Sequence, residues 1–291
     1  MRPPLVLAMS SADSDGAAGL PADLKTFTAL GVYGAGVTTM VCSATTQGVG
    51  DVHHLPPAVI RSQIDAVVGD LLIDAVKIGA LGSAAAVAAV AQAVREHRGR
   101  LGRIVLDPVM ISSQGEALIS AEGAQALRDQ LVPLVDMVCA NMSEAAQLLG
   151  RPLATTIEEM RDQALALQAM GPDSVLITGG RLVDADAVDV LVHPGGTDLL
   201  RAARVPDRRV RGAGSTLSAA IAAQVARLAD FDRAGELGEI GEEGADDDVV
   251  TVVASAREFL ASAIENAADW QISRRPGGSV PVNHLITLDA R

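Results

Sequence analysis

The alternation of short apolar runs with helical stretches is the feature that most constrains the fold of this chain. Six apolar runs predict strands, at Leu5–Met9, Val37–Cys42, Ala75–Ile78, Ile104–Leu106, Met137–Cys139 and Val175–Ile177. The stretches between them predict helices, at Ala22–Leu30, Pro57–Leu72, Ala84–His97, Ala121–Leu131, Met142–Leu149 and Ile157–Met170. Repeated strand–helix units form parallel strands with right-handed crossovers. The sequence therefore predicts a doubly wound, mostly parallel α/β sheet with helices on both faces, in three layers.

The rest of the chain extends this pattern. It predicts a hairpin with strands Ala187–Val192 and Leu200–Val205, a helix that starts near Gly214, and a last helix from Val249 to about Ala268. A chain of 291 residues can form one large α/β domain, so we expect a single domain over residues 1–291. Aromatic residues make up only 2% of the chain, which predicts a core of Ala, Val, Leu and Ile.

The net charge of −13 is unevenly distributed along the chain. Residues 230–248 contain nine acidic side chains and one basic side chain, so this segment alone carries −8. Residues 235–248 are also poor in large apolar residues, and we expect them to form a mobile, acidic loop between two helices. We expect residues 270–291 to form a C-terminal tail that wraps the surface.

Several classes of partner do not fit the sequence. The first apolar run is too short for a signal peptide or a membrane span, so we expect no membrane partner. No basic patch with interleaved aromatic residues is present, which argues against nucleic acid. Cys42 and Cys139 lie far apart and show no metal-ligand spacing, which fits reduced, buried thiols and a cytoplasmic protein.

Polar and small residues follow four of the predicted strands. Ligands of a doubly wound sheet bind beyond the carboxyl ends of its strands, so these residues are candidates for a site. They are Ser10–Gly19, Asp107–Met110, Asn141–Glu144 and Thr178–Arg181. Asp107 could hold a metal ion or a water molecule. Each segment alone fits a turn or a helix cap, but four of them together with a fifth, glycine-rich turn favour a ligand site.

That fifth segment is the glycine turn Gly212–Ser218. Gly212 and Gly214 open a helix of small residues, and the first turn of a helix has backbone N–H groups without intrahelical partners and the positive end of the helix dipole. Such a turn stabilises a phosphate without any side chain. Ser215 is a poor general base unless another group activates it, and the alternative interpretation is an ordinary serine near a helix start.

Four segments carry a family resemblance. Ala22–Gly34, Asp74–Gly79, Val105–Met110 and Thr216–Ala223 closely resemble the hydroxymethylpyrimidine and phosphomethylpyrimidine kinases of thiamine biosynthesis, which belong to the ribokinase-like superfamily. The resemblance runs from about Leu5 to the final helix, in the same order. It implies a ribokinase-like fold, ATP-dependent phosphorylation of hydroxymethylpyrimidine or its monophosphate, Mg²⁺ on the nucleotide phosphates, and a homodimer.

The resemblance also implies roles for individual residues. Asp23, Ala18 and Val109 match positions at the pyrimidine pocket. Asn141 and Glu144 match the motif near the nucleotide phosphates and the metal, which places Glu144 beside Asp107 as a candidate metal ligand. Gly212 and Gly214 match the anion-hole glycines, and Thr178, Gly180 and Arg181 fall at the nucleotide.

Other positions depart from the family pattern, and they cluster in the site. Ser215 stands where the family has a cysteine that acts as the presumed base. Ala44 replaces a glutamine that binds the pyrimidine edge, and Ala80 replaces a pocket methionine. Ser113 and Thr178 replace lysines, Arg181 replaces a histidine, and Ser11 and Ala17 replace glycines of the first-strand loop.

Three functions remain open at this point. The first is a pyrimidine kinase of the thiamine pathway. The second is a kinase for a different small hydroxymethyl substrate, for which Ala44 and Ala80 would enlarge the pocket. The third is a catalytically impaired or inactive homologue with a binding or regulatory role, which the loss of the base at Ser215 would explain. We place kinase activity first.

Overall fold

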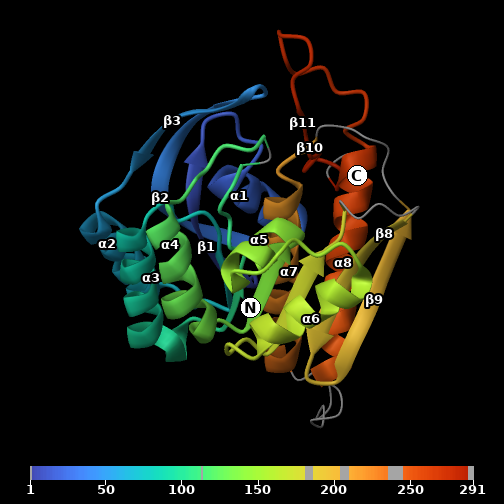
Figure 1. The fold of residues 1–291 in the computed structure, drawn as a ribbon. Coiled ribbons are helices and arrows are strands. Elements are labelled where there is room, and N and C mark those ends of the chain that lie inside the picture. Colours follow the sequence, from blue (N-terminus) through green and yellow to red (C-terminus); the bar gives the residue numbers. More distant parts are fainter. Residues whose placement is uncertain (1, 113, 181–185, 204–209, 235–244, 288–291) are drawn as a thin grey trace.

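The computed structural model describes residues 2–112, 114–180, 186–203, 210–234 and 245–287. Within these residues a nine-stranded sheet has the order β3-β2-β1-β4-β5-β6-β7-β8-β9 (Figure 1). Its strands are β1 (Leu5–Asp13), β2 (Tyr33–Thr45), β3 (Gly48–His54), β4 (Ala75–Ile78), β5 (Arg103–Leu106), β6 (Met137–Asn141), β7 (Ser174–Thr178), β8 (Asp186–His193) and β9 (Gly196–Ala203). The six central strands are parallel, whereas β3, β8 and β9 pair antiparallel at the two edges. The predicted mostly parallel sheet is confirmed.

Helices cover both faces of the sheet. They are α1 (Gly19–Ala29), α2 (Pro57–Asp70), α3 (Ala84–His97), α4 (Ala121–Ala126), α5 (Met142–Leu149), α6 (Ile157–Gln168), α7 (Ala213–Ala234) and α8 (Ala245–Glu265). Successive strand residues point to opposite faces, so β1 feeds two cores: Leu5, Leu7 and Met9 pack in the cluster with α2 to α6, and Val6 and Ala8 in the cluster with α1, α7 and α8. The structure thus has the predicted three layers.

Several elements differ from the sequence predictions. β2 and β9 have other bounds than the predicted Val37–Cys42 and Leu200–Val205. β1 continues to Asp13, so Ser10 to Asp13 are strand and not loop. β3 was not predicted, because its glycines, aspartate and histidines hide any apolar alternation. The helix predicted at Ala121–Leu131 is α4 followed by a π-helical turn at Leu127–Leu131. The last helix begins at Ala245, so residues 245–248 are helical and not part of a loop; residues 235–244 lie outside the described part.

The C-terminal segment is tied to the glycine turn. β11 (Val280–Pro281) pairs in parallel with β10 (Val210–Arg211), which directly precedes Gly212. His284 is buried, and its Nε2 lies 2.9 Å from the hydroxyl of Thr216 in the first turn of α7. The tail up to residue 287 therefore helps to fix the start of α7 and does more than wrap the surface.

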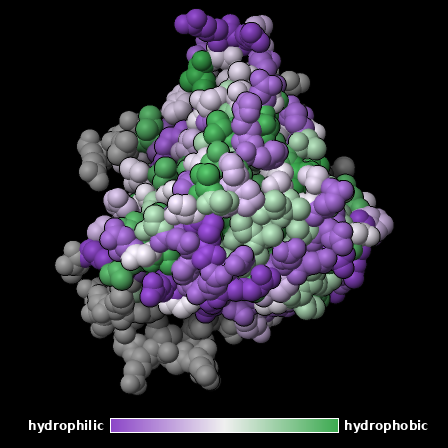
Figure 2. Space-filling model, turned by 90° about the vertical axis from the view of Figure 1, so that its left-hand side faces the viewer, coloured by the Kyte–Doolittle hydropathy of each residue, from purple (hydrophilic) through white to green (hydrophobic). Residues whose placement is uncertain are grey.

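Three further predictions concern the surface, the cysteines and membrane spans. The face that carries α2 and α3 shows a broad band of hydrophilic side chains with smaller apolar groups between them (Figure 2). Both cysteines are buried and unpaired, as predicted. In the described part of the chain, no helix has the length and apolar character needed to cross a membrane.

Candidate active site

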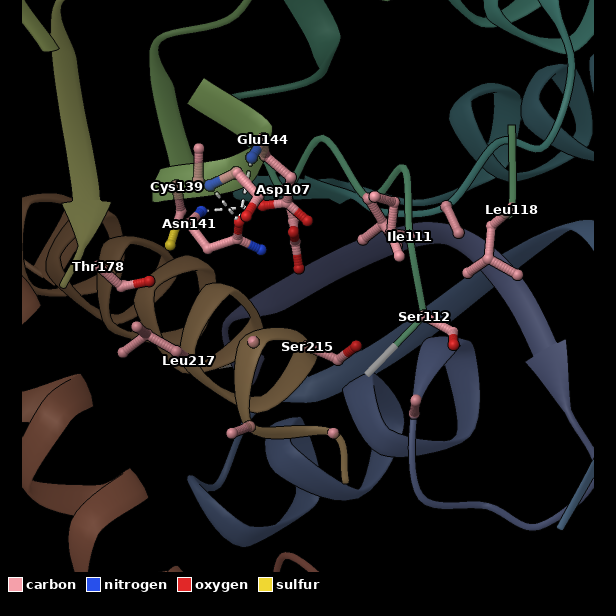
Figure 3. Close-up of a pocket in the computed structure, with 18 of the residues that line it drawn as sticks. Asp107, Ile111, Ser112, Leu118, Cys139, Asn141, Glu144, Thr178, Ser215 and Leu217 are labelled. Carbon is pink, nitrogen blue, oxygen red and sulfur yellow. Dashed lines mark hydrogen bonds between the residues drawn. The ribbon is translucent and has the colours of Figure 1, made fainter. Parts of the chain in front are cut away.

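A cavity of about 730 Å³ lies at the carboxyl ends of the parallel strands (Figure 3). It brings together eleven of the predicted site residues: Ala18, Ala80, Asp107, Val109, Asn141, Glu144, Thr178, Gly180, Gly212, Gly214 and Ser215. They come from segments that are up to about 200 residues apart in the sequence and meet because parallel strands end at the same edge of a sheet.

The glycine turn has a backbone that only glycine fits at Gly212. Its φ angle is +86°, and a Cβ atom there would lie 1.8 Å from the carbonyl oxygen of Ala17. The N–H of Thr216 donates to the Gly212 carbonyl at 2.9 Å, which starts helix α7. The N–H groups of residues 213–215 precede this first bond, so the helix offers them no acceptor. The turn therefore has the geometry of an anion-binding helix start at the cavity wall.

Gly214 and Ser215 differ from Gly212 in what constrains them. A Cβ atom at Gly214 would meet no heavy atom within 4 Å, so sterics do not require glycine there. The Ser215 hydroxyl lines the cavity and accepts a long hydrogen bond, 3.4 Å, from the N–H of Gly19 at the start of α1. This serine thus links two helix starts, and its role in chemistry stays a prediction.

Asn141 and Glu144 form a complete capping box at the start of α5. The Asn141 side-chain oxygen accepts from the N–H groups of Ser143 and Glu144 at 2.9 and 3.0 Å, and the Glu144 carboxylate accepts from the Asn141 N–H at 2.9 Å. The capping alternative considered from the sequence is therefore present. Both residues also line the cavity, so the cap holds them at its wall (Figure 3).

Asp107 lies at the cavity wall, in a buried network of polar and charged side chains. The Ser218 hydroxyl donates to Asp107 at 2.9 Å. Burial raises the pKa of Asp107, and the nearby Lys77 ammonium and the Ser218 hydrogen bond oppose that shift. Asp107 and Glu144 are the two predicted metal ligands, and both carboxylates line the cavity. Mg²⁺ binds proteins through one or two carboxylates plus substrate phosphates, so this donor set fits a nucleotide-bound Mg²⁺.

Asp23, predicted at the substrate, is not among the residues that line the cavity. Its side chain is 0% exposed, and the Lys77 ammonium donates to both carboxylate oxygens at 2.9 and 3.0 Å. Burial raises the pKa of Asp23 to about 6, although Lys77 lowers it. The Asp23 carboxylate is thus a buried partner of Lys77 in this structure, and its role at the substrate stays a prediction.

One part of the cavity, predicted to hold the substrate, is lined by apolar residues of the strand β3, the segment after β4 and the segment after β5. Its apolar residues include Val49, Ala80, Val109, Ile111 and Leu118. Ala44, predicted in this part, is buried in β2 and does not line the cavity.

The backbone of Ala44 is fixed by one side chain, because the Ser14 hydroxyl is 2.9 Å from both the N–H and the carbonyl oxygen of Ala44. Arg181 and Ser113 lie outside the described residues.

The end of β7 and the turn that follows it, predicted to lie at the nucleotide, form another part of the cavity wall. Thr178 and Gly180 line the cavity, and between them the Gly179 N–H donates to the buried Asp189 carboxylate at 2.9 Å. Arg257 of α8 binds the other oxygen of Asp189 at 2.8 Å. This ion pair fixes the turn from the side opposite to the cavity.

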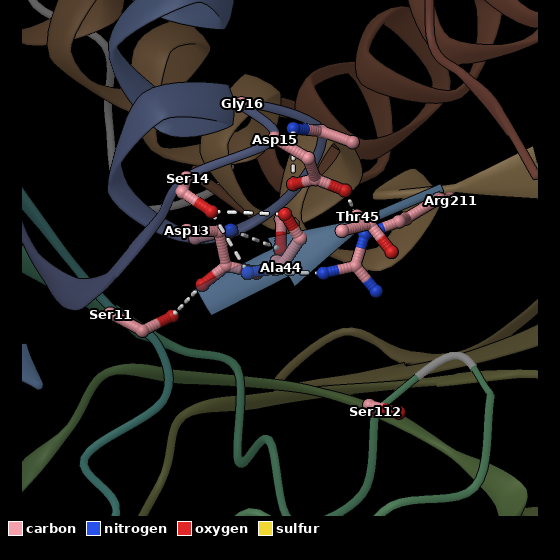
Figure 4. Close-up of polar contacts among 12 residues, drawn as sticks. Ser11, Asp13, Ser14, Asp15, Gly16, Ala44, Thr45, Ser112 and Arg211 are labelled. Carbon is pink, nitrogen blue, oxygen red and sulfur yellow. Dashed lines mark hydrogen bonds and ion pairs between the residues drawn. The ribbon is translucent and has the colours of Figure 1, made fainter. Parts of the chain in front are cut away.

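Sequence reasoning missed one charged group at the site. Arg211 lines the cavity and pairs with Asp13 and Asp15 (Figure 4). The sequence offered one signal for it: Arg211 directly precedes the glycine turn that was already predicted to bind a phosphate. Asp13 and Asp15 lay inside the loop predicted at Ser10–Gly19, but nothing in the sequence joined them to a residue almost 200 positions away.

Comparison with known proteins agrees with this architecture. The phosphomethylpyrimidine kinase family model matches residues 13–239. A hydroxymethylpyrimidine/phosphomethylpyrimidine kinase of Salmonella typhimurium is 42% identical over 279 residues, which cover 96% of each protein. The pyridoxal kinase of Bacillus subtilis, solved as an ADP complex, has a TM-score of 0.81 at 29% identity over the whole of both chains. The phosphomethylpyrimidine kinase of Clostridium difficile has a TM-score of 0.72 at 30% identity, over 89% of this chain and 99% of that one.

These likenesses confirm the predicted ribokinase-like fold. The family match spans the glycine turn and the strands from β2 to β9 that flank the cavity, and it begins at the last residue of β1. On the strength of this match and of the identity across nearly the whole length, the chain belongs to the phosphomethylpyrimidine kinase family.

Proposed function

We propose that this protein is an ATP-dependent kinase that phosphorylates hydroxymethylpyrimidine or its monophosphate in thiamine biosynthesis. The observation that carries the proposal is the glycine turn, whose unpartnered N–H groups face a cavity at the carboxyl ends of the sheet. Family membership supports it, and the relative of known structure with bound ADP supports ATP as the donor. The alternative of an inactive homologue is not favoured by these relatives.

The residues of the cavity fit a reaction that depends on positioning and charge. Phosphoryl transfer passes through a loose transition state, so catalysis rests on holding the reactants and stabilising the equatorial oxygens. The N–H groups of residues 213–215 would stabilise that charge. Mg²⁺, when bound through Glu144 and Asp107, would neutralise the nucleotide phosphates. Thr178 and Gly180 would contact the nucleotide, and the apolar end would hold the ring.

The proposal extends to cofactor, assembly and location. Mg²⁺ as the required cation, a homodimer and a cytoplasmic location stay predictions from the family resemblance. The second candidate substrate, a different small hydroxymethyl compound, is likewise not favoured by these relatives.

An ADP-release assay with Mg-ATP tests the proposal. Hydroxymethylpyrimidine and its monophosphate are offered separately, and an active family member is run alongside as the control. We expect turnover with at least one of the two substrates. Background turnover with both, while the control is active, would refute the proposed substrate class.

The Ser215→Cys variant then tests what the serine changes. A thiol at a helix start has a lowered pKa and serves as a base at neutral pH. We expect kcat to rise on the order of ten-fold, within what general bases contribute. An unchanged kcat would instead indicate that other departures from the family pattern, such as Ala80 at the cavity wall, limit activity.

A further inference from the structure

Two turns that are far apart in the sequence meet at one wall of the cavity. The first precedes α1 and includes Asp15 and Ala17; the second precedes α7 and includes Gly212. The Ala17 carbonyl packs so closely on Gly212 that no Cβ atom fits between them. The N–H of Gly19 donates to the Ser215 hydroxyl. The position of the anion-binding turn therefore depends on the turn before α1.

Arg211 joins these two turns by buried charges. Its Nη2 donates to Asp13 Oδ2 at 3.0 Å, and its Nε lies 2.8 Å from Asp15 Oδ2, as an ion pair without an aligned hydrogen bond. The three side chains, which we call the Arg211 clasp, are 3%, 6% and 9% exposed for Arg211, Asp13 and Asp15. Figure 4 shows the guanidinium between the two carboxylates.

Both carboxylates are themselves held in place. The Ser11 hydroxyl donates to Asp13 Oδ1 at 2.8 Å, and the Ala17 N–H donates to Asp15 Oδ1 at 3.1 Å. The guanidinium is a planar fork that can meet two acceptors at once, whereas an ammonium is a point charge. Because Arg211 is covalently next to Gly212, a fixed guanidinium fixes the glycine turn.

The charge balance decides what the clasp does. Two carboxylates face one guanidinium, so the positive charge of Arg211 is already compensated and is a weak attraction for a phosphate. The backbone N–H groups of the turn are not compensated in this way. The clasp is therefore suited to hold those N–H groups in position, and it is poorly suited to bind the anion itself.

We propose that Arg211 is a positioning residue for phosphoryl transfer: paired with Asp13 and Asp15, it holds the N–H groups of residues 213–215 at the place where the transferred phosphoryl group develops charge. This inference rests on the proposed kinase function. It predicts that disturbing the clasp lowers kcat and leaves the KM for ATP unchanged, because the nucleotide end is built by other elements.

Three variants and one control test the inference. Arg211→Lys keeps the charge and loses the fork; Asp15→Asn keeps an oxygen for the Ala17 N–H and loses one charge; the third variant combines both. Arg98→Lys is the matched control, and we expect it to leave kcat unchanged. Arg98 is exposed and pairs with Asp136 at the amino ends of the strands, away from the cavity. We expect Arg211→Lys to lower kcat about 100-fold, the scale of a misplaced reacting group or a lost oxyanion donor. Asp15→Asn should lower it about ten-fold, and the double variant no further than Arg211→Lys.

A second measurement does not need turnover. Amide hydrogen exchange of peptides that cover residues 210–218 should become faster in Arg211→Lys and Asp15→Asn, whereas peptides that cover the start of α5 should not change. Unchanged exchange at residues 210–218 in both variants would overturn the inference, whether or not the wild type is active. An inactive wild type with faster exchange in the variants would refute only the proposed function.

Two kinetic results for Arg211→Lys, and one for the double variant, would also overturn the inference. One is a wild-type kcat in Arg211→Lys. The other is a KM that rises for the monophosphate alone with kcat unchanged, which would make Arg211 a direct ligand of the substrate phosphate. Additive losses in the double variant would likewise contradict a shared clasp.

Discussion

The two ends of the parallel sheet carry ion pairs of similar chemistry in opposite surroundings. At the amino end, Arg103 lies 2.7 Å from Asp173, and the two side chains are 62% and 56% exposed. At the carboxyl end, Arg211 lies 3.0 Å from Asp13, and both are almost fully buried. An exposed pair contributes roughly 0.2–1 kcal/mol, whereas breaking a buried pair costs about 3–5 kcal/mol because one charge stays unpaired.

The difference shows where the fold buries charged side chains, at a cost in free energy, to hold backbone segments in a defined position. Buried charges are poor stabilisers compared with apolar residues of the same volume, yet Lys77, Arg211 and Arg257 all pair with carboxylates near the cavity. Surface pairs at the other end could be removed with little effect. The buried pairs hold specific backbone segments, which apolar contacts position less sharply.

The Lys77→Met variant should show the largest effect on stability. It leaves Asp23 without its partner at a fully buried position, and we expect the free energy of unfolding to fall by about 3–5 kcal/mol at pH 8. Without Lys77, the pKa of the buried Asp23 should rise further above its wild-type value of about 6, so the loss relative to the wild type should grow as the pH rises above about 6. Urea unfolding at pH 5 and pH 8 measures it. Equal losses at both pH values would contradict the assignment.

The Gly212→Ala variant should have the next largest effect, in this case on activity. The added Cβ would overlap the Ala17 carbonyl, so the turn must move, and we expect kcat to fall at least about 100-fold. Gly69→Ala in α2 is the control, because its Cβ also enters open space and Gly69 does not line the cavity. Similar losses in the two variants would show that the close approach at Gly212 is not what matters.

The His284→Gln variant tests the pH response of the carboxyl end. Burial, and then the charge of Lys25, lower the pKa of His284 to about 4. The unfolded chain therefore binds more protons than the folded one between about pH 4 and 6.5, and stability falls as the pH drops through this range.

We expect protonation of this histidine in the unfolded chain to lower the free energy of unfolding by about 2 kcal/mol between pH 7 and pH 5. Thermal or urea unfolding at the two pH values measures the loss, which His284→Gln should lack. A wild-type pH dependence in the variant would exclude His284 as its source.

The Arg103→Ala variant should show the smallest effect. Its pair with Asp173 is exposed, so we expect the free energy of unfolding to change by less than about 1 kcal/mol and kcat to stay at the wild-type value. Urea unfolding with a parallel turnover assay checks both. A loss of several kcal/mol would remove the contrast between the two ends of the sheet.

The sequence predicted the layers well because the strands are short, apolar and buried on both faces. Three elements have the predicted bounds: β4 at Ala75–Ile78, α3 at Ala84–His97 and α5 at Met142–Leu149. The edge strand β3 was missed because solvent covers much of it, so its sequence need not alternate. The rule that ligands bind beyond strand ends found Asp107, Asn141 and Thr178, since it needs only the order of the chain.

Positions set by long-range packing could not be predicted in the same way. The resemblance gave Asp23 a place at the substrate, but the orientation of α1 turns its carboxylate toward Lys77, 54 positions along the chain. Arg211 was missed because its partners are defined only when the first and last parts of the chain are together.

The Arg211 clasp also has a consequence for the order of folding. The contact between Arg211 and Asp13 closes a loop of 198 residues. The entropy of closing a loop grows only slowly with its length, by roughly 0.6 kcal/mol per doubling, so such a contact is acceptable at equilibrium. Contacts of this separation nevertheless form late, because the intervening units must condense first. During synthesis, the first strand and the units that follow it can therefore assemble a sheet well before the anion-binding turn exists, and the site becomes complete only with the last third of the chain.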